Sequence, residues 1–232
     1  MQGRKLMTYQ NIKKAKFIER PNRFIAYCEI NGKTEVCHVK NTGRCKELLI
    51  PGVTVYVQEA NSPTRKTKYD LISVVKGDRL INIDSQAPNK VFYEWAISGK
   101  FLPDITLIKP ESVFQNSRFD FYIETENKKA FVEVKGVTLE EKGVVMFPDA
   151  PTERGVKHIE ELIQAKKQGY EAFIVFIVQM ESVNYFTPNI KTHKTFADKL
   201  KEANKYGVKV ICYDCKVSEN SLSVNDRINI IL

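Results

Sequence analysis

The segment SRFDFYIETENKKAFVEVKG, residues 117–136, reads as two apolar strands joined by a polar turn. Asp120 and Glu133 lie among Phe, Val and Ile, and Lys135 follows Glu133 by two positions. A two-residue turn at 126–127 would place Asp120 opposite Glu133, and Cβ atoms of such neighbours lie about 4.5–5.5 Å apart. Lys135 shares the face of Glu133, because side chains alternate along a strand. A turn shifted by one residue would instead place Asp120 opposite Lys135, so the three side chains converge in either register.

Two adjacent carboxylates repel each other, and burial would strongly raise the pKa of one of them. Mg²⁺ or Mn²⁺ would relieve this repulsion, since Mg²⁺ binds one or two carboxylates together with waters and substrate phosphate. A neighbouring lysine can orient the attacking water or stabilise charge on the phosphate. The spacing therefore fits metal-dependent phosphodiester hydrolysis, with Asp120, Glu133 and Lys135 catalytic and the two carboxylates as metal ligands. It fits a purely structural ion triad equally well.

Further candidates flank this segment. Residues 87–101 have the apolar spacing of a helix, and Glu94 on that helix could reach a metal from outside the sheet; the alternative is an exposed helix carboxylate. An amphipathic helix is expected within residues 150–169, with Arg154, Lys157 and His158 at or near its N-terminus. Backbone N–H groups and the helix dipole attract phosphate there. We include these three residues among the candidate DNA-binding residues.

The charge of the chain is unevenly distributed. Residues 1–85 hold 16 Lys and Arg against 8 Asp and Glu, whereas residues 86–232 hold 20 of each. A concentrated positive charge favours a polyanion-binding module, most often for nucleic acid, although a basic surface that aids solubility is the alternative. The candidates in or beside expected loops are Arg20, Arg23, Asn41, Thr42, Arg44, Arg65, Lys66 and Lys68.

The strand pattern predicts two domains with a boundary between residues 85 and 86. Residues 1–85 read as five short strands, at 23–30, 34–40, 53–60, 68–76 and 79–84, which suit a closed OB-like barrel. Residues 86–232 alternate strands with helices and predict an α/β domain with a mixed sheet flanked by helices. A helix is expected at 194–207, with Thr195 and Asp198 spaced as a capping box.

Other features bound the protein class. The sequence contains no transmembrane run or signal peptide, so a cytoplasmic protein that does not bind membranes is expected. The five cysteines are odd in number and are expected to be reduced. Cys212 and Cys215 have CxxC spacing, but residues three apart on a strand point to opposite faces, which suits a metal poorly.

Several linked stretches, among them NTGRCKELLIPG (41–52), FVEVKGVTL (131–139) and FPDAPTERGVKHIEEL (147–162), resemble the sugar fermentation stimulation protein A family. The resemblance implies an N-terminal OB-like domain, a C-terminal domain of the PD-(D/E)XK nuclease-like fold, DNA binding and a link to transcription regulation of sugar-utilisation genes. Asp120, Glu133 and Lys135 match the nuclease signature, and Glu94 matches its helix glutamate. Phe119 stands where that signature has proline.

Two functions remain open from the sequence. The first is a DNA-binding protein with a Mg²⁺-dependent nuclease site. The second is a non-catalytic DNA-binding regulator that retains the nuclease fold. The oligomeric state, including a homodimer, is also left open.

Overall fold

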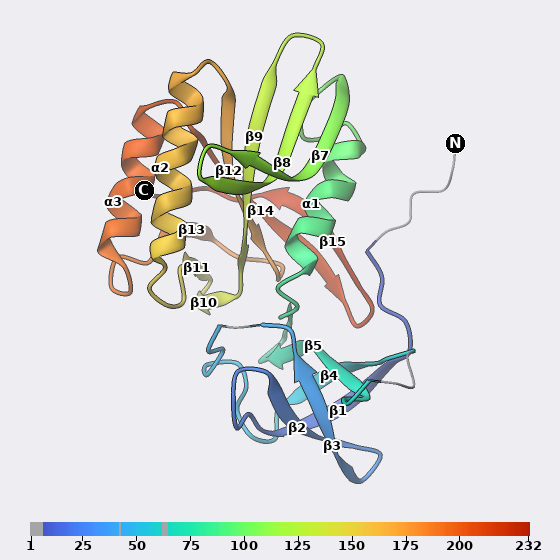
Figure 1. Cartoon of the computed structure of the whole chain (residues 1–232). Helices are drawn as coiled ribbons and strands as arrows, with labels where there is room; N and C mark the ends of the chain where they lie inside the picture. The colour runs from blue at the N-terminus through green and yellow to red at the C-terminus, as the bar shows by residue number, and fades with distance from the viewer. Residues whose placement is uncertain (1–6, 42, 62–64) are drawn as a thin grey trace.

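The computed structural model describes residues 7–41, 43–61 and 65–232. Its first part is a barrel (Figure 1) of strands in the order β3-β2-β1-β4-β5, closed by a parallel pairing of β3 with β5. A sixth strand extends β5 as a hairpin. The strands are β1 (Ile12–Glu19), β2 (Ile25–Ile30), β3 (Lys33–Val39), β4 (Thr54–Glu59), β5 (Tyr69–Lys76) and β6 (Arg79–Asn82).

The predicted closed five-stranded barrel is confirmed, but the predicted set of strands was wrong in one respect. Strand β1 was not predicted, and it pairs with both β2 and β4 inside the barrel. The expected fifth strand is β6, which pairs only with β5 in the main sheet of the barrel. Lysines at 13, 14 and 16 hide the alternation of β1, whose Ala15 and Phe17 are buried.

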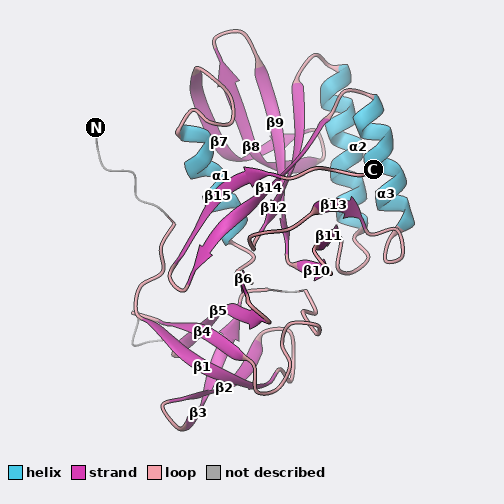
Figure 2. Cartoon of the chain, turned by 180° about the vertical axis from the view of Figure 1, so that it is seen from behind, coloured by secondary structure: helices cyan, strands magenta, loops and turns pink. Residues whose placement is uncertain are grey.

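The second part of the chain is a mixed six-stranded sheet with helices on both faces (Figures 1 and 2). Its strand order is β15-β14-β12-β9-β8-β7, with β9, β12 and β14 parallel. A small sheet, β10-β11-β13, lies beside it. The strands are β7 (Ile105–Phe114), β8 (Ser117–Thr125), β9 (Lys129–Val137), β10 (Leu139–Glu141), β11 (Val144–Phe147), β12 (Glu171–Val178), β13 (Tyr185–Pro188), β14 (Lys209–Ser218) and β15 (Ser221–Arg227).

Three helices cover this sheet. Helix α1 (Ala87–Ile97) packs on one face, and α2 (Glu153–Lys167) and α3 (Lys194–Lys205) pack on the other. Helix α3 begins at Lys194 with His193 as its N-cap, so the predicted capping box of Thr195 and Asp198 is wrong. Thr195 already lies inside the helix, where its side chain cannot cap the first turn.

The β8–β9 hairpin has the expected register. Phe121 pairs with Val132 and Tyr122 with Phe131, and the Thr125 N–H bonds the Lys128 carbonyl across the turn. The ladder ends at the Phe121–Val132 pair. Beyond that pair the two strands separate, which opens the space that holds Asp120 and Glu133.

Cys212 and Cys215 lie on opposite faces of β14, as expected, because one packs with the α2–α3 core and the other with the α1 core. All five cysteines are free and buried. No helix in the described residues is long and apolar enough to cross a membrane.

Polar contacts join the barrel to the α/β domain. Glu140 on β10 accepts hydrogen bonds from Lys76 at 2.7 Å and pairs with Arg79 at 2.7 Å, and both cations lie at the β5–β6 turn. A buried set made by Tyr9, Asn82 and Gln179 adds direct hydrogen bonds, with 2.8 Å between Gln179 Nε2 and Asn82 Oδ1. These contacts fix the barrel against the sheet that carries the candidate site.

Candidate functional site

Glu133 is the centre of the hairpin site. The residue is 3% exposed, and its Oε1 accepts hydrogen bonds from Lys135 Nζ at 2.5 Å and from His158 Nδ1. Its other oxygen, Oε2, is buried and has no hydrogen-bond partner among the residues that the structure describes. A buried carboxylate oxygen that lacks a partner carries a large desolvation cost, so this atom calls for a functional explanation.

Helix α2 brings His158 to Glu133. Thr152 caps the helix, because its Oγ1 accepts the Gly155 N–H at 3.0 Å. Arg154 Nε lies 3.4 Å from His158 Nε2, one turn further along, and donates to that nitrogen. His158 Nε2 is therefore the acceptor, and Nδ1 carries the proton that is donated to Glu133. Arg154 and His158 share one face of α2, as expected, and His158 on that face contacts Glu133.

Asp120 lies where β8 leaves β9. Its Oδ2 accepts the Val134 N–H at 2.7 Å, in place of a ladder hydrogen bond, and its Oδ1 accepts from Asn89 at 2.7 Å. Gly136 helps to place Asn89, because a Cβ at this position would lie 2.7 Å from Pro88 at the start of α1. The missing side chain lets α1 approach the sheet at the level of the site.

The two carboxylates have opposite pKa shifts. Burial and the neighbouring charge of Glu133 raise the pKa of Asp120 from 3.8 to about 6, against the hydrogen bonds from Val134 and Asn89. Burial also acts to raise the pKa of Glu133, but the His158 hydrogen bond and the Lys135 charge outweigh it and lower that pKa. Perturbed pKa values of this kind concentrate at functional sites.

Lys135 and Glu133 are therefore in direct contact, and the charges of both act on Asp120. Within the described part of the chain, no three His, Cys, Asp or Glu side chains are grouped closely enough to hold a metal by themselves. Two carboxylates are the donors that the hairpin offers. The sequence analysis missed Asn89 and the role of His158 as the partner of Glu133. The spacing of residues within one strand or one helix does not predict contacts between different elements.

Glu94 lies on the α1 side of Asp120. Both residues line a cavity of about 410 Å³, and Glu94 Oε2 accepts the backbone N–H of Met7 at 2.8 Å. Burial raises the pKa of Glu94. The carboxylate therefore anchors the N-terminal segment to α1, and its predicted role as a metal ligand stays a prediction.

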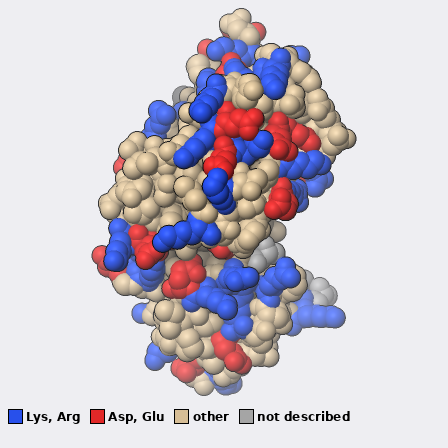
Figure 3. Space-filling model, turned by 90° about the vertical axis from the view of Figure 1, so that its left-hand side faces the viewer, with Lys and Arg blue, Asp and Glu red and all other residues tan. Residues whose placement is uncertain are grey.

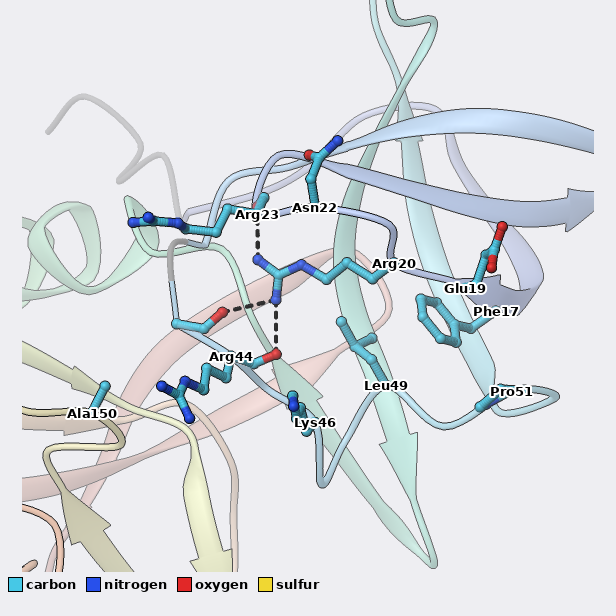
Figure 4. Close-up of a pocket in the computed structure, with 11 residues that line it drawn as sticks. Phe17, Glu19, Arg20, Asn22, Arg23, Arg44, Lys46, Leu49, Pro51 and Ala150 are labelled. Carbon is cyan, nitrogen blue, oxygen red and sulfur yellow. Dashed lines mark hydrogen bonds between the residues drawn. The ribbon is translucent and has the colours of Figure 1, made fainter.

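Three of the basic candidates of the barrel, Arg20, Arg23 and Arg44, line a second cavity, of about 630 Å³, shown in Figure 4. Arg23, Arg44 and Lys46 line it together with the apolar side chains of Phe17 and Leu49. Ala150 of the α/β domain also lines it, so the cavity spans the junction of the two domains. In Figure 3, Lys and Arg gather on the barrel beside this junction, whereas both signs alternate over α2 and α3.

Arg20 has a different role from its neighbours. Its guanidinium donates to the carbonyls of Gly43, Arg44 and Arg23 at 2.7–3.0 Å (Figure 4). It also donates to the carbonyl of Asn41 at 2.6 Å. Asn41 also works inside this loop, because its side chain accepts the Gly43 N–H and donates to the Ile83 carbonyl. Both residues hold the loop that presents Arg44.

The other basic candidates are spread over the surface. Arg65 makes a two-pronged ion pair with Asp70, and although burial acts to raise the pKa of Asp70, hydrogen bonds from Arg65 and Lys40 lower it to about 2. Lys68 pairs with Glu59 at 3.0 Å, and Lys66 is exposed. Lys157 donates to the Asn116 carbonyl at 3.0 Å. Thr42 lies outside the described residues.

The fold and the site define the class of protein. It has a closed OB barrel joined to a mixed-sheet α/β domain, and a buried cluster of Glu133, Lys135 and His158 lies where the β8–β9 ladder ends. Two family models match the chain: the SfsA N-terminal OB domain over residues 18–83 and the sugar fermentation stimulation protein RE domain over residues 86–221. The chain belongs to the sugar fermentation stimulation protein (SfsA) family.

Relatives match over almost their whole length. A sugar fermentation stimulation protein homolog of Clostridium beijerinckii is 61% identical, with 97% of this chain and 100% of the relative covered. A homolog of Desulfitobacterium hafniense is 62% identical, with 97% and 99% covered. The solved structure of Pyrococcus furiosus SfsA in complex with Ca²⁺ superposes with a TM-score of 0.89 at 31% identity, over 98% of this chain and 99% of that one.

Proposed function

We propose that this protein binds DNA and carries a Mg²⁺- or Mn²⁺-dependent site for phosphodiester hydrolysis, of the PD-(D/E)XK nuclease type. The observation that carries the proposal is the unpartnered, buried Oε2 of Glu133 beside the raised pKa of Asp120. Both features are expected where carboxylates are arranged for a cation. The solved relative in complex with Ca²⁺ supports a divalent site in this family.

The residues present fit such a cation. Asp120 and Glu133 would hold it through carboxylate oxygens, the ligands that Mg²⁺ prefers. When bound, it would neutralise the two carboxylates and promote ionisation of a water nucleophile. Asp120 and Glu133 are the two protein ligands of the cation in this proposal.

The surrounding side chains have distinct tasks in this proposal. Lys135 Nζ directs positive charge to the place where charge develops on the phosphate. His158 donates to Oε1 of Glu133 and leaves Oε2 available, while Arg154 fixes the tautomer of His158. Asn89 and the Val134 N–H orient Asp120.

The basic barrel would supply most of the affinity for DNA. The net charge of residues 1–85 is +8 and that of residues 86–232 is zero, by the counts of Lys and Arg against Asp and Glu. Phosphate contacts by Arg23, Arg44 and Lys46 release counterions, so the affinity should fall steeply with salt. The cavity that these residues line lies at the junction with the α/β domain, which would position a bound strand toward the hairpin site.

The test is calorimetric titration with Mg²⁺ and Mn²⁺, followed by cleavage assays on single-stranded, duplex and branched DNA. Wild-type protein should bind the metal, and Asp120→Asn and Glu133→Gln should each weaken binding and abolish cleavage. A wild-type heat signal equal to that of the double variant would refute the metal site.

A second function, a non-catalytic DNA-binding regulator linked to sugar-utilisation genes, is favoured by one observation. Oε1 of Glu133 already receives two donors, from Lys135 and His158, as a structural ion cluster would. Under this alternative, the wild-type protein binds DNA in a salt-dependent manner and cuts none of the three substrates with either metal.

A further inference from the structure

The cavity beside Asp120 lies outside the Glu133–Lys135–His158 cluster. It has a volume of about 410 Å³ and lies between α1, β7 and β8, with Asp120 in its wall. That volume is within the range of sites that take small molecules or single groups. Of its other lining residues, Asn89 orients Asp120 in the proposed hydrolysis, whereas Tyr93 has no part in it.

Tyr93 provides a flat aromatic surface in this cavity. Its ring lies over that of Phe121, with centroids 6.2 Å apart and planes at 26°, and Phe121 is 3% exposed. Tyr93 itself is 38% exposed, although it is a large side chain that borders the core. The ring is therefore held by the protein and still accessible, as a stacking platform must be.

The charges around Tyr93 select the kind of group that can enter. The lining contains three acidic residues, Glu94, Glu111 and Asp120, against one lysine, Lys90, and Glu111 is paired with Arg118 at 2.7 Å. The net negative charge of this lining is unfavourable for a phosphate inside the cavity. A nucleobase is neutral, has an aromatic face for Tyr93, and in most bases carries an amino group that can donate to a carboxylate.

We propose that this cavity receives one unstacked base of a DNA strand whose phosphodiester lies at Asp120, so that the substrate is single-stranded or frayed DNA. The inference rests on the proposed function, because Asp120 sets where the backbone lies. Bases inside a duplex are stacked on both faces and have no free face for Tyr93. Duplex DNA would therefore contact the barrel and leave this cavity empty.

The experiment measures binding of the full chain in Ca²⁺, with the strands checked by gel to be intact, to a single-stranded oligonucleotide containing 2-aminopurine and to the same sequence as a duplex. Loss of one base–aromatic stack should weaken single-strand binding of Tyr93→Leu by about 5- to 150-fold and remove the fluorescence change. Tyr93→Phe keeps the ring and should bind like wild type. Duplex affinity should be the same for all three proteins.

Leucine keeps an apolar cover over Phe121, and the melting temperature of each variant reports whether it folds. Tyr206→Leu is the matched control, since Tyr206 is 49% exposed at the end of α3, which packs on the face of the sheet opposite α1. Equal single-strand affinity of Tyr93→Leu and wild type overturns the inference and leaves the proposed function standing. Equal losses in the Leu and Phe variants also overturn it, because they would implicate the hydroxyl. A wild-type protein that binds neither oligonucleotide overturns the proposed function itself.

Discussion

Replacing Asp120 by asparagine should stabilise the metal-free protein at neutral and alkaline pH. The folded protein raises the pKa of Asp120 from 3.8 to about 6, first through burial and then through the charge of Glu133. The folded state therefore binds more protons than the unfolded chain between pH 3.8 and about 6. Stability falls as the pH rises through this window, and the loss is complete above it.

The magnitude follows from the same values. Each pKa unit corresponds to about 1.4 kcal/mol, so ionised Asp120 costs the folded state about 3 kcal/mol above pH 7. Asparagine has nearly the same shape and carries no charge. Its amide can accept the Val134 N–H and face a flipped Asn89, so both present hydrogen-bond positions are kept. For a chain of this length the gain corresponds to an increase of about 6–12 °C in Tm, as an upper bound.

The assay is thermal unfolding of wild type and Asp120→Asn in EDTA at pH 4 and pH 8. The variant should melt higher at pH 8, and the difference should shrink toward pH 4, where Asp120 is protonated in the folded state. Added Mg²⁺ should stabilise the wild type more than the variant, because a ligand that binds only the folded state raises its stability in proportion to its affinity. A variant that melts at or below the wild-type temperature at pH 8 would refute the reasoning.

Three further predictions concern single groups. Lys135→Met should lower stability by about 1.5–3 kcal/mol in EDTA, less than a fully unpaired buried charge would cost, because His158 still donates to Glu133. In Mg²⁺ the variant should cleave DNA more slowly by orders of magnitude, with unchanged DNA affinity. A large loss of Tm in the variant, together with a wild-type protein that cleaves no DNA, would favour the regulator. Mg²⁺ affinity measured by calorimetry should fall as the pH drops below about 6, since the cation must then displace the Asp120 proton; constant affinity between pH 8 and pH 5 would contradict this. Arg44→Ala should weaken DNA binding and flatten its salt dependence at unchanged Tm, whereas Arg20→Ala should lower Tm, because it removes four loop hydrogen bonds; equal effects of the two variants would show that the division of roles is wrong.

The sequence predicted the hairpin register because strand geometry leaves few choices. Alternation of side chains and a short polar turn between apolar runs fix which residues face each other. The same reasoning failed for β1, where lysines at exposed positions obscured Ala15 and Phe17. It also failed for Thr195, which is the second residue of the helix rather than its N-cap.

Contacts between elements distant in the sequence were beyond that kind of reasoning. His158 was predicted to bind phosphate from its place at a helix N-terminus, yet it donates to Glu133, which lies 25 residues away in the sequence. Arg20 was grouped with Arg23 and Arg44 by charge, but its guanidinium is committed to loop carbonyls. Residue type gives the chemistry that a side chain can perform, and only packing decides which partner it meets.

The opposite pKa shifts of the two hairpin carboxylates divide the site into a fixed part and an unsatisfied part. Glu133 keeps its charge because the His158 hydrogen bond and the Lys135 charge stabilise it, so this half is stable without a metal. Asp120 receives only neutral donors, from Asn89 and Val134, and its charge is therefore destabilising. A structural ion triad would place the lysine between both carboxylates and lower both pKa values. Retaining an aspartate that costs stability, where asparagine would fit, is the trade-off expected when activity requires the charge. The asymmetry between Asp120 and Glu133 thus favours a cation-binding role over a purely structural one.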